Sequence, residues 1–254
     1  MFIRSLRLTL ALMLGAAFPA WAGQAPQHIT VENGADPYSR PDGSGYANDV
    51  VRAAFAAVGV SIVFDVVPYA RCKQGVLSAR SATCVSMSWD PAFEGKIRFA
   101  DTPLITITPV YFENGERPLV ARSEAQLGAG LRIGTVRGYE YPPAAMRTRA
   151  RGAVFEEGQS ELSNLKKLAA GRLDAALVMS NPLTGVAHWA EAAEVGARVR
   201  LAFRSEESEY GYFAVSVEHP DGLALLEKYN AGIKRINGDG TVARLKSKWA
   251  KGHP

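Results

Sequence analysis

Residues 97–112 read IRFADTPLITITPVYF. β-Branched and aromatic residues dominate this run, a composition typical of extended backbone. The run is longer than an ordinary strand, so we expect it to leave one lobe of the molecule and enter a second. A further extended run, YGYFAVSV at 210–217, is expected to return the chain to the first lobe. Two such crossings predict two lobes with a cleft between them.

Helix and strand patterns alternate outside these crossings. One helix is expected to begin at a cap residue, Asn48, and to end at Gly59; another is expected to begin at Ser160 and to end near Gly171. Alternation with short connections predicts the α/β class, with mostly parallel sheets flanked by helices. The other expected strands are 61–67, 83–88, 131–136, 174–180 and 197–203, and the other expected helices are 69–79, 182–193, 220–237 and 241–250.

The carboxyl ends of the expected strands suggest where a ligand binds. In open α/β sheets, ligands gather at these ends. Here they carry the segments SMSW at 86–89, TVRGYEY at 135–141 and VMSN at 178–181. We therefore expect these three segments to face the cleft.

The N-terminus has the pattern of a secretory signal. Arg4 and Arg7 precede a short apolar run, and Ala-Trp-Ala at 20–22 has the small residues that a signal peptidase requires. A buried helix or a membrane anchor is the alternative, but the run is too short to span a bilayer. We predict a signal peptide over residues 1–22, cleavage after Ala22 and a soluble periplasmic protein. No Cys stands directly after the cleavage site, so no lipid anchor is expected.

Charge and cysteine content limit the partners and the compartment. The full chain carries a net charge of +4, and loss of Arg4 and Arg7 with the signal halves it. Lys and Arg form no dense patch, so nucleic acid is not the expected partner. Cys72 and Cys84 predict a disulfide in an oxidising compartment. A redox pair and two buried free thiols are the alternatives.

No motif for a cofactor, a metal or hydrolysis is recognised. The glycine-rich segment GAGLRIG at 128–134 precedes its strand, whereas a phosphate-binding turn follows one. The four histidines are scattered without ligand spacing, and no G-x-S-x-G segment occurs. We expect no cofactor and no metal.

Six segments, in this order, resemble one protein family. The mature chain is similar, over nearly its whole length, to the periplasmic solute-binding proteins of polar-amino-acid-type ABC transporters, bacterial extracellular solute-binding proteins of family 3, as a divergent member. The matching segments are DPYSRPDGSGYANDVVRAAFAAVG at 36–59, SMSWDPAFEGKIRFADTPLI at 86–105, LRIGTVRGYEY at 131–141, LAAGRLDAALVMSNP at 168–182, YGYFAV at 210–215 and INGDGTVARLKSKW at 236–249.

The resemblance implies a two-lobed periplasmic binding protein fold, hinged by two crossover strands. Lobe 1 is then expected to comprise residues 23–110 and 212–254, and lobe 2 residues 111–211. A protein of this kind closes on a small solute and delivers it to an ABC permease in the inner membrane. A monomer is expected.

Several positions keep the family's ligand-binding set. Tyr38 and Tyr69 stand where aromatic residues sandwich the ligand, and Ser86 and Ser88 match polar positions at a strand end. Glu32 lies near the place of an acid for the ligand's distal charge. The resemblance therefore assigns these five residues to the ligand site.

Other positions depart from the family. Phe93 stands where an Arg pairs with the carboxylate of an α-amino acid, and Met179, or Ser180 in a register shifted by one, stands where an acid holds the ammonium group. Loss of only one partner would leave an unpaired charge in a closing site. Loss of both predicts a ligand other than a standard α-amino acid.

The remaining candidates leave alternatives open. Trp89, Phe93, Tyr139 and Tyr141 line an aromatic cleft or pack between the lobes. Arg137 or Arg71 replaces the missing carboxylate partner, or is a solvated surface residue. Glu140 pairs with Arg137, meets a cationic ligand or is solvated. The candidate ligand-binding residues are Glu32, Tyr38, Tyr69, Arg71, Ser86, Ser88, Trp89, Phe93, Arg137, Tyr139, Glu140, Tyr141 and Met179.

Three functions fit these residues. The leading hypothesis is a non-enzymatic receptor that feeds an ABC importer. The second is an enzyme on the same scaffold, similar to cyclohexadienyl dehydratase, with Glu32 or Glu140 as the general acid. The third is an accessory or sensory protein whose closed lobes dock on a dehydrogenase or a sensor kinase.

Overall fold

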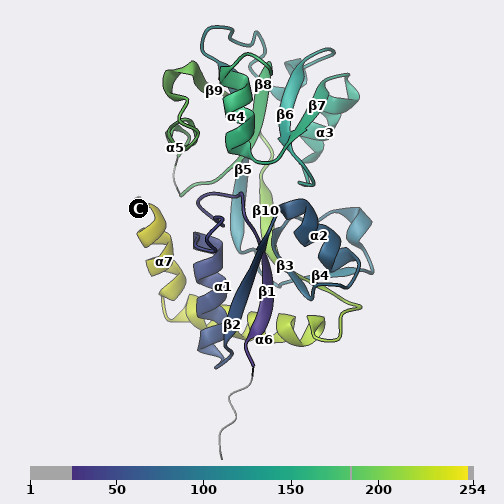
Figure 1. Ribbon diagram of the computed structural model, residues 1–254, viewed down its shortest axis with the longest axis vertical. Helices are drawn as coiled ribbons and strands as arrows, with labels where there is room; N and C mark the ends of the chain where they lie inside the picture. Colours follow the sequence, from purple (N-terminus) through teal and green to yellow (C-terminus); the bar gives the residue numbers. More distant parts are fainter. Residues whose placement is uncertain (1–24, 184, 251–254) are drawn as a thin grey trace, which may run out of the picture.

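The computed structural model describes residues 25–183 and 185–250. Two lobes lie one above the other and are joined by two long strands, β5 (Ile105–Asn114) and β10 (Glu209–Ser216) (Figure 1). The α/β class and the two-lobed architecture predicted from the sequence are confirmed. The predicted signal segment, residues 1–22, lies outside the described residues.

Lobe 1 contains the elements from β1 to β4 and the C-terminal helices (Figure 1). The strands β1 and β2 pair in parallel, with Gln27 opposite Ile62 and Glu32 opposite Val67. Its elements are β1 (Gln27–Glu32), α1 (Tyr46–Ala57), β2 (Ile62–Val67), α2 (Tyr69–Leu77), β3 (Thr83–Met87), β4 (Ile97–Phe99), α6 (Gly222–Gly238) and α7 (Thr241–Ala250).

Lobe 2 repeats the alternation of strands and helices (Figure 1). The strand β6 pairs in parallel with both β7 and β8. The first turn of α4 has a capping box, in which the side chains of Ser160 and Ser163 each accept a backbone N–H of the other. Its elements are β6 (Arg132–Val136), α3 (Pro143–Ala150), β7 (Val154–Gly158), α4 (Glu161–Ala169), β8 (Ala175–Ser180), α5 (Ala187–Ala192) and β9 (Val199–Arg204).

The crossing strands make the main sheet more mixed than the helix–strand alternation predicts. β10 pairs antiparallel with β3, β4 and β5, and β5 pairs antiparallel with β8 and β9. The parallel pairing predicted from the sequence holds for β1 with β2 and for β6 with β7 and β8. The two long strands therefore carry a continuous hydrogen-bonded sheet from one lobe into the other.

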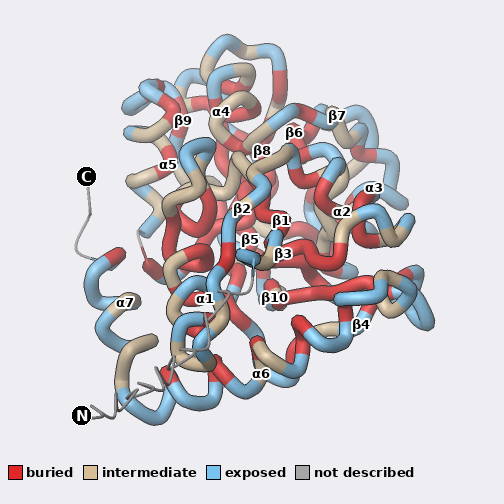
Figure 2. Tube along the Cα trace, turned by 60° about the horizontal axis from the view of Figure 1, so that its bottom comes forward, coloured by how far each residue is buried: buried red, intermediate tan, exposed pale blue. Residues whose placement is uncertain are grey.

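The core of lobe 1 forms where α1 and α6 pack on the strands. The rings of Phe213 and Tyr229 stack with centroids 4.3 Å apart, and Phe55 packs beside both. At Gly232, a Cβ atom would lie 2.0 Å from the carbonyl oxygen of Ala54, so only glycine allows α6 to approach α1 this closely. Figure 2 shows that the central strands are buried, while the surface helices alternate between buried and exposed turns.

Two local predictions from the sequence need correction. Asn48 does not cap its helix, because α1 begins two residues earlier, after Gly45. Its side chain is buried and donates to the hydroxyl of Ser39 at 2.9 Å and to the carbonyl of Gly43 at 3.1 Å. Of the helix expected over 182–193, only Ala187–Ala192 is helical among the described residues.

A disulfide joins Cys72 in α2 to Cys84 in β3, as the sequence predicts. The Cα atoms are 5.4 Å apart, a normal separation for this bond. Both residues are fully buried. The bond ties the helix that begins at Tyr69 to the strand that contains Ser86.

Among the described residues, no helix combines the length and the apolar character needed to cross a bilayer.

Candidate ligand site between the lobes

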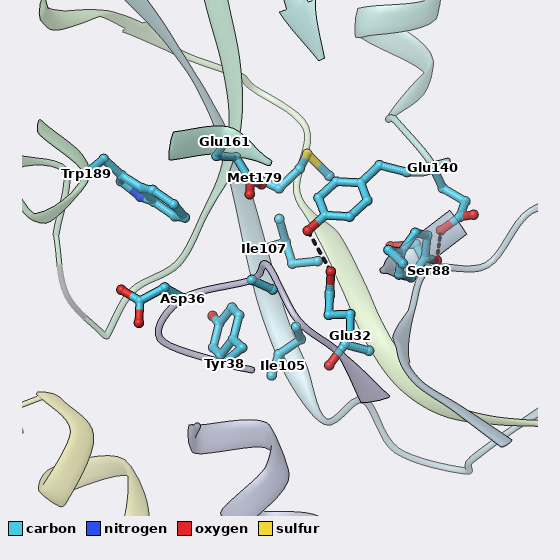
Figure 3. A pocket seen from close by; sticks show the side chains of 14 residues that line it. Glu32, Asp36, Tyr38, Ser88, Ile105, Ile107, Glu140, Glu161, Met179 and Trp189 are labelled. Atoms are coloured by element: carbon cyan, nitrogen blue, oxygen red, sulfur yellow. Dashed lines mark hydrogen bonds between the residues drawn. The ribbon is translucent and has the colours of Figure 1, made fainter. Parts of the chain in front are cut away.

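A pocket lies where the lobes meet, at the ends of β1 and β3 and beside the crossing strand β5 (Figure 3). Its cavity has a volume of about 30 Å³, room for about two or three water-sized groups. Four acidic side chains, four aromatic side chains, two serines, two isoleucines, an alanine and a methionine form its wall. They are Glu32, Ala35, Asp36, Tyr38, Tyr69, Ser86, Ser88, Ile105, Ile107, Tyr139, Glu140, Glu161, Met179 and Trp189.

A β-bulge in β3 positions Ser86 at this pocket. Met87 faces Tyr212 and Val85 faces Phe213 across the strands, so Ser86 is the extra residue. Its φ of 67° is a left-handed conformation, which costs a serine about 1–3 kcal/mol. Its buried hydroxyl oxygen has no hydrogen-bond partner. The bulge thus holds an unpaired polar group against the cavity.

Tyr139 of lobe 2 reaches across to lobe 1. Its hydroxyl donates a 2.8 Å hydrogen bond to Oε2 of Glu32 (Figure 3), and its ring meets Tyr69 edge-on with centroids 4.9 Å apart. Burial, before any other cause, raises the pKa of Tyr139 well above its usual value, so the hydroxyl stays protonated and donates. Tyr139 therefore connects the lobes beside the cavity.

Glu140 forms a second link between the lobes. It accepts hydrogen bonds from the hydroxyl of Tyr69 and, at 2.8 Å, from Nζ of Lys73, both in α2. Lys73 also donates to the carbonyl of Gly138. Burial raises the pKa of Glu140, and the charge of Lys73 opposes that rise. Glu140 and Lys73 thus form a partly buried ion pair across the interface.

Asp36 provides a third link on the opposite side of the pocket. Its carboxylate binds Nε2 of His188 in α5 of lobe 2 and accepts a hydrogen bond from Arg40 of its own lobe. Burial raises the pKa of Asp36, but the hydrogen bonds from His188 and Arg40 outweigh it and lower the pKa below its usual value. Asp36 is therefore a satisfied, ionised carboxylate.

Glu32 and Glu161 are different, because the cations that neutralise Asp36 and Glu140 do not reach them. Glu32 is 4% exposed and Glu161 is 2% exposed. Burial raises the pKa of each to about 8; repulsion from Glu140 adds to the rise at Glu32, and repulsion from Glu32 adds to the rise at Glu161. Oε2 of Glu161 is buried without a hydrogen-bond partner. The pocket therefore contains two carboxyl groups whose charge is poorly compensated.

Aromatic and apolar side chains form the remaining wall. Tyr38 is buried and donates its hydroxyl to the carbonyl of Thr106 at 2.9 Å, so its ring face is the part available to the cavity. Trp189 is 1% exposed and donates its indole N–H to the hydroxyl of Ser180 at 3.1 Å. Ile105, Ile107 and Met179 complete this part of the wall.

Three backbone N–H groups at the turn after β6 already have hydrogen-bond partners in lobe 2. The N–H of Arg137 donates to Gly158, that of Tyr139 to Val136, and that of Val136 to the hydroxyl of Tyr141. At Gly138, φ is 87° and a Cβ would lie 3.1 Å from Ala70 of lobe 1, so glycine allows this turn to approach α2. The turn therefore packs against lobe 1, while these three N–H groups donate hydrogen bonds within lobe 2.

The structure brings together eight of the thirteen residues predicted for the site. Glu32, Tyr38, Tyr69, Ser86, Ser88, Tyr139, Glu140 and Met179 line the pocket.

The other five lie elsewhere. Trp89 is 61% exposed, and Arg71 is exposed on α2. Phe93 is buried against Phe99 in a cluster under α2. Arg137 does not pair with Glu140; it is exposed and lies 3.5 Å from Glu157. Tyr141 packs behind the pocket against Phe155.

Sequence reasoning missed six lining residues, and two of them matter most. Glu161 stands at the first position of α4, directly after a recognisable cap residue, where an acidic residue usually indicates a solvated helix start. Trp189 lies on the short helix α5, which the sequence pattern predicted to begin earlier, at residue 182. The four others are Ala35, Asp36, Ile105 and Ile107.

No group of three or more His, Cys, Asp or Glu side chains suited to a metal ion occurs within residues 25–183 and 185–250.

Comparison with solved structures identifies the fold. A histidine kinase sensor domain with similarity to periplasmic binding proteins matches with a TM-score of 0.75 at 19% identity, over 89% of this chain and 96% of that chain. An ancestral arginine-binding protein bound to arginine matches with a TM-score of 0.75 at 17% identity, over 89% and 99%. An ancestral amino acid-binding protein, a precursor of cyclohexadienyl dehydratase, matches with a TM-score of 0.70 at 18% identity, over 88% and 95%.

The sequence itself identifies the family. A search of curated proteins finds no match. The model of the bacterial extracellular solute-binding proteins, family 3, matches residues 28–252, which is nearly the whole chain and confirms the resemblance found in the sequence. The chain therefore belongs to the bacterial extracellular solute-binding proteins of family 3.

Proposed function

We propose that this protein is a periplasmic receptor that closes on a small solute between its lobes and delivers it to an ABC importer. The solute is not a standard α-amino acid. One observation carries this proposal: among the described residues, no Arg or Lys lines the pocket. An α-carboxylate would be buried there without a positive partner, at a cost of several kcal/mol.

The mature receptor begins after Ala22 and acts in the periplasm without a lipid anchor. Lobe 1 comprises residues 23–110 and 212–254, and lobe 2 comprises residues 111–211. Family membership and the two-lobed fold support this division. The receptor acts as a monomer that meets an inner-membrane permease; a single molecular mass in light scattering after gel filtration supports the monomer, and a dimer mass contradicts it.

The first test is a thermal-shift screen. The protein is purified from the periplasm, stripped of solutes by unfolding and refolding, and melted with amino acids, organic acids, amines and neutral solutes. Binding at a hundredfold excess over the dissociation constant stabilises the folded state by about 2.7 kcal/mol. Stabilisation by a compound that is not an α-amino acid supports the proposal. Strong stabilisation by an α-amino acid contradicts it, and so does the absence of stabilisation by every compound in the screen.

A dehydratase is the second candidate, favoured by the buried carboxyl group of Glu32, whose pKa is raised to about 8. Glu140, the other acid considered for this role, is paired with Lys73. A carboxylic acid that is still protonated near neutral pH is suited to donate a proton. Within the described part of the chain, no Arg or Lys of the pocket wall meets the two carboxylates of prephenate, which weighs against this function. Phenylpyruvate formation from prephenate by the purified protein would establish it, and a receptor forms none.

A docking role on a sensor kinase or a dehydrogenase is the third candidate. One similar fold is that of a histidine kinase sensor domain. Cross-linking of the solute-loaded protein in periplasmic extracts distinguishes the roles, because a receptor for import is captured with a permease and an accessory protein with another enzyme or kinase.

A further inference from the structure

We propose that the solute is a small organic cation, an amine without a carboxylate, held between Glu161 of lobe 2 and Glu32 of lobe 1. This inference rests on the proposed receptor function and specifies the ligand class of the same pocket.

Glu161 provides the first step of the argument. Its side chain points from the start of α4 toward the cavity (Figure 3). It is 2% exposed, and its Oε2 atom has no hydrogen-bond partner. An unpartnered buried carboxylate oxygen costs several kcal/mol. A positively charged donor in the cavity would remove that cost.

Glu32 provides the second step, because it faces the cavity from the opposite lobe (Figure 3). Repulsion from Glu32 contributes to the raised pKa of Glu161, so the two carboxyl groups interact across the pocket. Closing the lobes therefore brings two acidic groups together at low dielectric. A cation between them converts this repulsion into attraction and would favour the closed form.

The other two pocket acids already have partners within the protein. Lys73 binds Glu140 at 2.8 Å, and Arg40 and His188 bind Asp36. Each of these acids is thus compensated by its own partners, and the two groups lie on opposite sides of the cavity. The charge left for a ligand to compensate is that of Glu32 and Glu161.

The wall suits an organic ammonium group better than a bare ion. Tyr38 and Trp189 line the cavity and have their polar atoms engaged with the protein, so the rings offer their faces or edges to a ligand. An aromatic face attracts an ammonium group by about 0.5–2 kcal/mol. Ser86 adds a hydroxyl oxygen that lacks a partner and accepts an N–H hydrogen bond.

The pocket also disfavours a carboxylate on the same ligand. At the turn of lobe 2, the N–H groups of Arg137 and Tyr139 donate to backbone carbonyls of the same lobe, and that of Val136 donates to the hydroxyl of Tyr141. These three donors are therefore not available to a carboxylate, and repulsion from Glu161 and Glu32 disfavours it further. An amine therefore fits where an α-amino acid does not.

The cavity volume limits the ligand in this conformation. About 30 Å³ holds about two or three water-sized groups, which suits the charged end of an amine. A longer amine requires the lobes to stand slightly further apart or Tyr139 to move. The charged end is the part that the structure assigns to the two carboxylates.

Isothermal titration calorimetry tests the proposal with matched probes. The stripped protein is titrated at about pH 8.5, where ionisation of both carboxyl groups is favoured, with ethylamine and putrescine. Ethanol and butanediol are the neutral counterparts, acetate and succinate are the anions, and glycine, glutamine and arginine are the amino acids. Potassium chloride tests for a bare inorganic ion. We expect the two amines to bind and the other probes to bind at least about tenfold more weakly.

Three variants locate the binding. Glu161→Gln keeps the size of the side chain and should weaken amine binding by about tenfold or more. Glu161→Asp keeps the charge and should preserve the preference for amines over alcohols. Glu227→Gln removes an exposed acid of α6 and should leave the dissociation constant unchanged. Melting temperatures confirm that each variant folds before its titration is interpreted.

The outcomes separate the two proposals. Amine binding that Glu161→Gln weakens and Glu227→Gln does not affect supports the cation site. Binding of an anion, a neutral solute, an amino acid or potassium without amine binding, or amine binding that Glu161→Gln does not affect, overturns the cation site. Of these, tight binding of an anion or a neutral solute leaves the receptor function standing. Absence of binding by every class overturns both.

Discussion

Tyr139 of lobe 2 donates a 2.8 Å hydrogen bond to Glu32 of lobe 1, directly beside the cavity. One oxygen of a poorly compensated carboxylate is thereby satisfied from the opposite lobe. The same bond links the two lobes, so the chemistry of the pocket and the closure of the molecule depend on each other.

Replacement of Tyr139 by Phe tests this link. The variant keeps the ring against Tyr69 but leaves Glu32 buried without its donor, which should lower the free energy of unfolding by about 1–3 kcal/mol. Denaturant titration measures the loss. Tyr210→Phe, at a tyrosine that is 45% exposed, is the control and should change stability by less than about 0.5 kcal/mol. Equal effects of the two variants would contradict the assigned role of Tyr139.

The pH dependence of stability should follow Glu32 and Glu161. Burial, the largest cause for each, raises the pKa from 4.5 to about 8, so the folded state binds protons that the unfolded state has lost. These groups therefore stabilise the fold fully below about pH 4.5, and this stability is lost as the pH rises through 8. The slope reaches about 1.4 kcal/mol per pH unit for each group.

Denaturant titrations of the stripped protein from about pH 5 to pH 9 check this dependence. Glu161→Gln should reduce the slope, and the exposed control Glu227→Gln should keep it. A stability that rises across this range would show that the two carboxyl groups are ionised and paired in the folded state.

The disulfide should contribute strongly to stability. Its removal by the double substitution Cys72→Ser and Cys84→Ser should cost about 2–4 kcal/mol, because the unfolded chain regains the freedom of the closed loop. Reductant should destabilise the natural protein by a similar amount and leave the double variant unchanged. Unaltered stability of the double variant would contradict the structural role of the bond.

Phe93→Arg tests whether the family's carboxylate partner can be restored. Phe93 is 5% exposed and has Nζ of Lys73 5.8 Å from its ring centroid. A second cation there should lower the free energy of unfolding by about 3 kcal/mol or more without creating amino-acid binding. Glu94→Arg places the same side chain at an exposed neighbour and should be tolerated. Tight glycine or glutamine binding by Phe93→Arg would show that this position reaches the ligand.

Local signals made much of this fold predictable. The extended run that became β5, the cap at Ser160 and the pair Cys72 and Cys84 each depend on a few neighbouring residues, and each is confirmed. Asn48 was misassigned because its partners, Ser39 and Gly43, lie in the preceding loop and bury it. A cap preference alone does not reveal such partners.

The site was harder to predict because tertiary closure defines it. Glu161 has the sequence context of an exposed first-turn acid, yet it is 2% exposed and lines a pocket formed by both lobes. Phe93 and Met179 were identified by position in the family pattern, yet only Met179 lines the pocket. The 3-10 turn Pro91–Phe93, capped by Asp90, directs Phe93 into the cluster under α2.

Closure of the lobes on a cation is tested most directly by the distance between them. Spin labels on cysteines at two exposed positions, Ala56 of α1 and Ala170 at the end of α4, report this distance by pulsed electron paramagnetic resonance. We predict that ethylamine or putrescine shifts the stripped protein to a shorter, narrower distribution, and that ethanol and butanediol do not. A distribution that is identical with and without every solute would contradict closure, and a shift caused by glycine but not by the amines would contradict the cation site.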